Sequence, residues 1–168
     1  MGIKSPQRKL IDKEFFSMNG LPNYENLPDI LRSLWQQPER EYQYFAIELL
    51  EKFSQKADKQ LITVLEELIL QKSWWDSVDL LVSHAVANYF RKYPEMIQDI
   101  TANWIESNNI WLQRTCIIFQ LLYKKETDSA LLFEYIRYCA ASNEFFIQKA
   151  IGWALRQYAR TNAEAGRS

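Results

Sequence analysis

The chain contains 168 residues and carries a formal net charge of −1 at pH 7. At roughly 150 residues per domain, this length predicts one domain, residues 1–168, with a core of its own. The near-neutral charge excludes the global basic field of a general nucleic-acid binder, and the 48% hydrophobic content excludes disorder as the main state.

The composition favours helices over strands. Only four glycines and five prolines are present, which leaves few tight turns for a sandwich or barrel. Apolar residues recur at helical spacing in blocks separated by short polar breaks. The predicted helices cover residues 6–17, 26–36, 39–54, 58–71, 75–92, 94–107, 110–123, 128–141 and 144–160. The sequence therefore predicts an all-α chain.

Several classes of site are not expected. Cys116 and Cys139 lie in apolar helical stretches, so a reducing cytoplasm is predicted rather than a disulfide framework. The single histidine, His84, fits a buried, hydrogen-bonded position better than a catalytic one. Neither a metal nor another cofactor is predicted, and no apolar run approaches the ~20 residues that span a membrane.

The helical blocks repeat with a period of about 35 residues. A shift of 35 aligns Ser107-Asn108 with Ser142-Asn143, and it aligns the segment 111–114 with the segment 146–149. A repeat of this length made of two helices is typical of an α-solenoid, an α-α superhelix whose units bury their apolar faces by stacking. The inner helices of such a solenoid line a concave groove.

One column of this repeat is polar throughout. Its members are Tyr44, Asp79, Arg114 and Lys149. Trp75 lies four residues before Asp79, and Trp153 lies four residues after Lys149, so each shares a helix face with the column. Two indoles, one carboxylate and two cations are thus expected to converge in the groove.

This combination suits a ligand that is aromatic, cationic in one part and anionic in its backbone, as alkylated DNA is. Cations bind phosphates, indole faces attract a cationic purine, and a carboxylate stabilises a sugar that becomes positive. The competing interpretation is structural. Tryptophans at helical spacing often fill gaps between repeats, and Asp79 is a candidate ion-pair partner of Arg114.

Three segments resemble the bacterial DNA alkylation repair glycosylases built from HEAT-like repeats. They are residues 72–79 (KSWWDSVD), residues 111–121 (WLQRTCIIFQL) and residues 144–156 (EFFIQKAIGWALR). The resemblance extends from Gly2 to about Asn162. Members of that family generally have further helices at both ends. This chain is therefore expected to lack helices that they carry before and after the matching region.

The resemblance implies a monomeric glycosylase that removes N3- and N7-alkylated purines from double-stranded DNA. Trp75, Asp79, Arg114 and Trp153 match the family's active-site residues. The residues expected to bind DNA are Arg114, Lys149, Arg156, Tyr44 and Lys72. In this interpretation Asp79 stabilises the oxocarbenium-like sugar and Arg114 holds a phosphate. The alternative is a non-catalytic helical-repeat module that binds DNA or a protein through its concave face.

Overall fold

The computed structural model describes residues 2–71 and 75–165, and within these ranges the regular secondary structure is helical, without a strand. Helix α1 (Ser5–Asn19) precedes four helix pairs. The first pair is α2 (Leu27–Gln36) with α3 (Arg40–Lys52). The second is α4 (Leu61–Leu70) with one irregular helix made of α5 (Trp75–Leu81) and α6 (Ala87–Lys92). The third is α7 (Ile97–Glu106) with α8 (Ile110–Ile118), and the fourth is α9 (Ser129–Cys139) with α10 (Phe145–Ala165). The predicted all-α class is confirmed.

The helix predicted over residues 75–92 contains an irregular turn. Helices α5 and α6 are joined without a break by a π-helical turn, η2 (Val82–Val86). A π turn inserts extra backbone per turn and rotates the residues that follow it relative to an ideal α-helix. This segment therefore departs from the simple helical spacing on which the sequence prediction relied.

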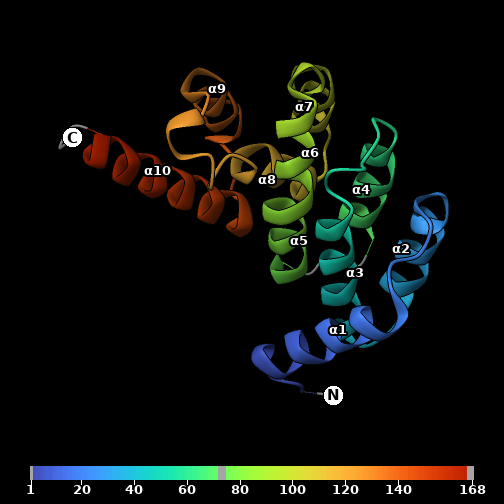
Figure 1. The fold of residues 1–168 in the computed structure, drawn as a ribbon. Helices are drawn as coiled ribbons and strands as arrows, with labels where there is room; N and C mark the ends of the chain where they lie inside the picture. The colour runs from blue at the N-terminus through green and yellow to red at the C-terminus, as the bar shows by residue number, and fades with distance from the viewer. Residues whose placement is uncertain (1, 72–74, 166–168) are drawn as a thin grey trace.

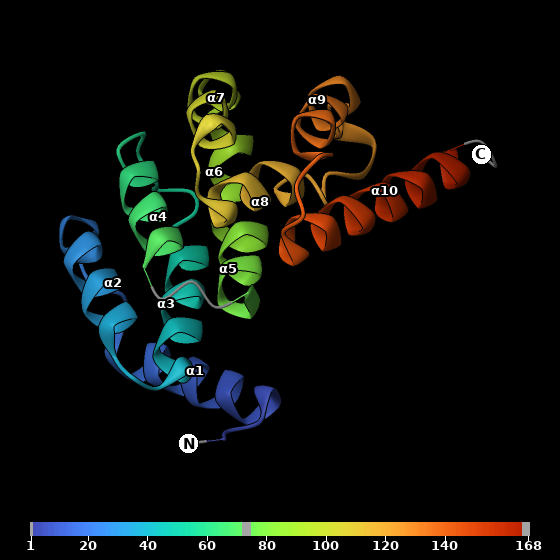
Figure 2. The ribbon, with the colours of Figure 1, turned by 180° about the vertical axis from the view of Figure 1, so that it is seen from behind.

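The helix pairs stack side by side in chain order and form an arc (Figures 1 and 2). Helix α1 crosses beneath α2 and α3 at one end, and α10 extends from the other end. In Figure 1 the N-terminal end of α1 points to the left below the stack, and α10 points to the upper left beyond α8. Helices α3, α5, α8 and α10 pack against one another in succession and make up the inner layer of this solenoid-like fold.

Hydrogen bonds between successive pairs reproduce the repeat seen in the sequence. The Trp35 indole N–H donates to the Gln71 carbonyl at 2.9 Å, 36 residues away. The hydroxyls of Tyr93 and Tyr123 donate to the carbonyls of Ala57 and Ala87, each also 36 residues away. Hydrogen bonds at one constant separation thus link neighbouring helix pairs in the first three repeats, as stacked units require.

The core runs continuously between the two helix layers. Trp35, Phe90 and Trp104 are fully or almost fully buried, and Phe90 contacts the Phe119 ring with centroids 5.0 Å apart. Leu81 and Cys116, which occupy equivalent places in the repeat, are both fully buried. Burial raises the pKa of the Cys116 thiol, in keeping with a small packing residue rather than a nucleophile.

Candidate functional site

The centre of the inner layer holds an ion pair between Asp79 of α5 and Arg114 of α8. Arg114 Nε donates to Asp79 Oδ1 and Arg114 Nη2 donates to Asp79 Oδ2, both at 2.9 Å. The two side chains are only 5% and 13% exposed, for Arg114 and Asp79 respectively. A planar guanidinium that grips both carboxylate oxygens fixes the position and the plane of that carboxylate. Asp79 is therefore held in one orientation near the surface of the inner layer.

Arg114 also connects this pair to α10. Its third nitrogen, Nη1, donates to the backbone carbonyl of Phe146, and its guanidinium carbon lies 5.9 Å from the centre of the Phe146 ring. The Phe146 ring packs in turn on Trp111 of α8, with centroids 5.0 Å apart. One buried arginine thus joins three of the four inner helices, α5, α8 and α10.

Two exposed tryptophans lie on α5 and α10, the two helices that Arg114 of α8 joins through Asp79 and Phe146. Trp75 is 53% exposed and lies one helical turn before Asp79, whereas Trp153 is 37% exposed and lies two turns after Phe146 on the same face of α10. Trp35 and Trp104, by contrast, are buried in the core. Packing therefore accounts for the buried indoles and leaves Trp75 and Trp153 open to a ligand.

The sequence matches the family described as "DNA alkylation repair enzyme" over residues 1–168. The chain belongs to this family. No curated protein sequence gives a significant match. A solved structure described as a predicted DNA alkylation repair enzyme from Enterococcus faecalis is 34% identical, with a TM-score of 0.87, and the match covers 96% of this chain and 76% of that one. The resemblance carried by the three sequence segments is confirmed at the level of the DNA alkylation repair family.

The residues predicted to bind DNA in this DNA alkylation repair family member occupy different environments. Lys149 and Arg156 are exposed on α10, as phosphate contacts require. Arg114 is buried and donates three of its five N–H groups within the protein, and its phosphate contact stays a prediction. Lys72 lies outside the described residues.

Tyr44 belongs to a second polar cluster, which the sequence did not predict. Its hydroxyl donates to Asp76 Oδ2 at 2.8 Å, and Arg40 Nη1 donates to the same oxygen at 2.7 Å. The Arg8 guanidinium of α1 lies over the Tyr44 ring, 4.2 Å from its centre. Burial, followed by the hydrogen bond to the Asp76 carboxylate, raises the pKa of Tyr44. Tyr44 is thus engaged by protein groups on both its ring and its hydroxyl.

The prediction for His84 was half wrong. Its side chain is 40% exposed rather than buried, and Nδ1 contacts Glu51 Oε1 of α3. His84 lies inside the π-helical turn, whose changed register displaces it from the apolar column that the 35-residue repeat assigned to it. It has a polar partner, as predicted, but in a different place.

Within residues 2–71 and 75–165, no group of three or more histidine, cysteine, aspartate or glutamate side chains is arranged to hold a metal ion. In the same ranges, no helix is both long and apolar enough to cross a membrane.

Proposed function

We propose that this chain is a monomeric DNA glycosylase that removes positively charged N3- and N7-alkylated purines from double-stranded DNA. The observation that carries the proposal is the Asp79 carboxylate, held by Arg114 on the inner layer and accompanied by the exposed indoles of Trp75 and Trp153. Membership of the DNA alkylation repair family supports DNA as the substrate.

The proposed reaction needs a negative charge near the sugar more than it needs a group that donates a proton to the leaving base. An alkylated purine already bears a positive charge, so the C1′–N bond breaks with its electron pair moving to the base, which leaves as a neutral molecule. The sugar is left oxocarbenium-like, and a fixed carboxylate stabilises that developing charge. Water then adds to C1′ and releases one proton to the solvent, so the charge that the alkylated purine carried ends on that proton. No imidazole is required for this step.

Arg114 is assigned to orienting Asp79. A carboxylate offers about four acceptor sites, of which Arg114 occupies two, so the others are left for a water molecule or the sugar. Because the carboxylate is fixed before the substrate arrives, little reorganisation accompanies the reaction.

The remaining residues are assigned to binding. The Trp75 and Trp153 faces are suited to a cationic purine or to the deoxyribose, an attraction of roughly 0.5–2 kcal/mol per cation–π contact. Lys149 and Arg156, both exposed on α10, are assigned to phosphates on one side of the lesion.

The experiment is release of base from methylated duplex DNA by the purified chain, with free 3-methyladenine and 7-methylguanine measured by chromatography. The matched control for a substitution at Asp79 is Glu67→Gln, which also neutralises a carboxylate but lies in the outer layer. This variant should release base at the wild-type rate. DNA binding without release would instead favour the non-catalytic module. A chain that neither binds methylated duplex DNA nor releases base from it would contradict the proposal that DNA is the substrate.

A further inference from the structure

The first turn of α5 is held from two sides. Asp79 is bound by Arg114, 35 residues later in the chain, and Asp76 is bound by Arg40, 36 residues earlier. The two carboxylates are three residues apart, so they lie on neighbouring parts of one helical turn. Trp75 immediately precedes Asp76.

The link through Asp76 extends across three helices. Arg40 and Tyr44 of α3 both donate to Asp76 Oδ2, and Arg8 of α1 lies over the Tyr44 ring. Next to it, the Ser77 hydroxyl donates to Gln43 Oε1 at 2.8 Å, and both of these side chains are fully or almost fully buried. The helix start that carries Trp75 is therefore attached to α3 at two successive residues.

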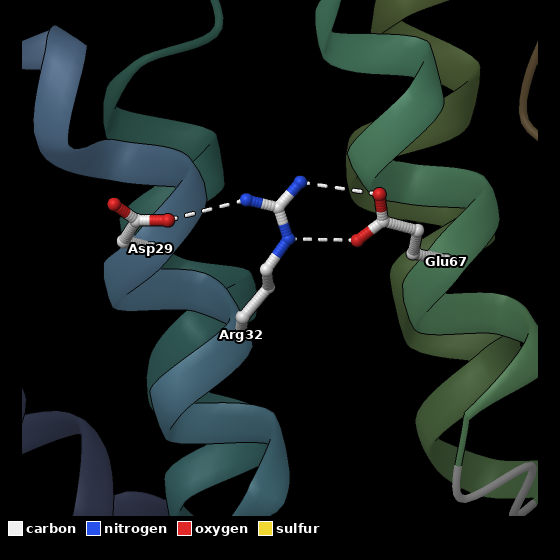
Figure 3. A network of polar contacts seen from close by, with 3 residues as sticks. All are labelled: Asp29, Arg32 and Glu67. Atoms are coloured by element: carbon white, nitrogen blue, oxygen red, sulfur yellow. Dashed lines mark hydrogen bonds and ion pairs between the residues drawn. The ribbon is translucent and has the colours of Figure 1, made fainter.

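The Asp76 cluster differs in its hydrogen bonding from the ion pair between Arg32 and Glu67, which joins two helices of the outer layer. In the outer layer, Arg32 of α2 binds Glu67 of α4 at 2.7 and 3.1 Å, and both Glu67 oxygens accept a hydrogen bond (Figure 3). At Asp76, both donors meet Oδ2, while Oδ1 is buried and accepts no hydrogen bond from any residue that the structure describes. A buried carboxylate oxygen without a donor is costly, so the Asp76 contact is less favourable for stability than the Arg32–Glu67 pair, in which both oxygens are satisfied.

We infer that Asp76 is a positioning residue, which holds Trp75 in the orientation that the excision reaction requires. The inference rests on the proposed glycosylase function. Arg40 and Tyr44 fix the Asp76 carboxylate, and this contact sets the rotation of the first turn of α5, on which Trp75 projects. A change at Asp76 therefore alters the direction of the indole without removing any group that touches the substrate.

Asp76→Asn tests this inference, with Glu67→Gln as the matched control. Both substitutions neutralise a carboxylate that bridges successive repeats, but only the first lies beside Trp75. We expect the maximal single-turnover rate of excision to fall roughly ten- to hundred-fold in Asp76→Asn, as a small misplacement of a group that positions the substrate produces. The DNA concentration that gives the half-maximal rate should rise as well, because the Trp75 face is assigned to binding. Glu67→Gln should retain both the wild-type rate and the wild-type half-maximal concentration.

A second measurement does not depend on catalysis. In protein labelled with 5-fluorotryptophan, the Trp75 resonance is assigned by its loss in Trp75→Phe. We expect this resonance to shift or broaden in Asp76→Asn and to stay unchanged in Glu67→Gln. An unmoved Trp75 resonance in folded Asp76→Asn overturns the inference whatever the rates are. If the wild-type chain releases no base, the proposed function fails while the fluorine spectrum still decides the role of Asp76.

Discussion

Arg114 grips both carboxylate oxygens of Asp79 at 2.9 Å across a separation of 35 residues, which is one full repeat. The pair is therefore part of the stacking between repeats as well as part of the candidate site. Both side chains are largely buried, so removing one partner leaves the charge of the other unpaired and shielded from water.

Arg114→Met should lower the free energy of unfolding by about 3–5 kcal/mol, because it leaves the Asp79 carboxylate unpaired. The double variant with Asp79→Asn should lose less than the sum of the two single variants, since the interaction is removed only once. Urea unfolding of the four proteins gives this coupling. Arg32→Met in the outer layer is the control. It should cost at most about 1 kcal/mol because its ion pair is more exposed. Additive losses at Asp79 and Arg114 would show that the pair contributes no coupling.

Lys149→Ala and Arg156→Ala should each reduce the salt dependence of DNA binding. A cation that neutralises one phosphate contributes about 0.9 to the slope of log K against log salt concentration. Fluorescence anisotropy with duplex DNA between low and moderate salt measures that slope. Arg32→Ala, on the outer layer, should leave it unchanged. Equal slopes in all four proteins would exclude α10 from contact with phosphates.

The period of 35 residues and the polar column could be predicted because a stacked repeat places equivalent residues in equivalent environments. Asp79 and Arg114 therefore meet as expected, and Leu81 and Cys116 are buried as expected. The column did not reveal that Arg114 is itself buried. A pattern of side chains also cannot show that Arg114 donates a hydrogen bond to the backbone carbonyl of Phe146.

The π-helical turn and the Asp76 cluster were not predictable in the same way. The π turn has no distinctive sequence, and it moved His84 out of its predicted place. Arg40 and Asp76 do show the repeat spacing, being 36 residues apart, but opposite charges at that spacing are common by chance. Three-dimensional packing was needed to show which of these pairs is formed.

The stability of the chain should decrease as the pH rises from 3.8 toward 7 because of Asp12. Its side chain is buried between α1 and α3, and burial, followed by proton sharing with Glu48, raises its pKa to about 7. The folded state therefore binds this proton more tightly than the unfolded state does. The resulting stabilisation is complete below 3.8, the ordinary pKa of an aspartate in an unfolded chain, and is lost as the pH approaches 7.

Asp12→Asn should flatten this pH dependence, since the amide carries no charge at any pH. The slope that Asp12 contributes between its unfolded and folded pKa values is at most about 1.4 kcal/mol per pH unit. Urea unfolding between pH 4.5 and 8.5 measures it, and the variant should be the more stable protein at pH 8. Parallel curves for the two proteins would show that Asp12 does not titrate in this range.

Gly152→Ala should stabilise α10. Glycine inside a helix costs roughly 0.5–1 kcal/mol relative to alanine, and a Cβ atom at position 152 meets only the Nη1 atom of Arg156, at 3.3 Å. The end of a flexible side chain can move by the few tenths of an ångström required. Urea unfolding should therefore show a gain of that size. A loss of stability would mean that Arg156 is held firmly in place over Gly152.

The rate of base release by Asp79→Asn tests the central claim most directly. By analogy with the loss of one preorganised electrostatic partner, the single-turnover rate on methylated duplex DNA should fall by about 10²–10³, or roughly 2.7–4 kcal/mol in the barrier. Circular dichroism and DNA binding, measured below the unfolding temperature of the variant, should match the wild type. A folded, DNA-binding Asp79→Asn protein that releases 3-methyladenine or 7-methylguanine at the wild-type rate would contradict the account.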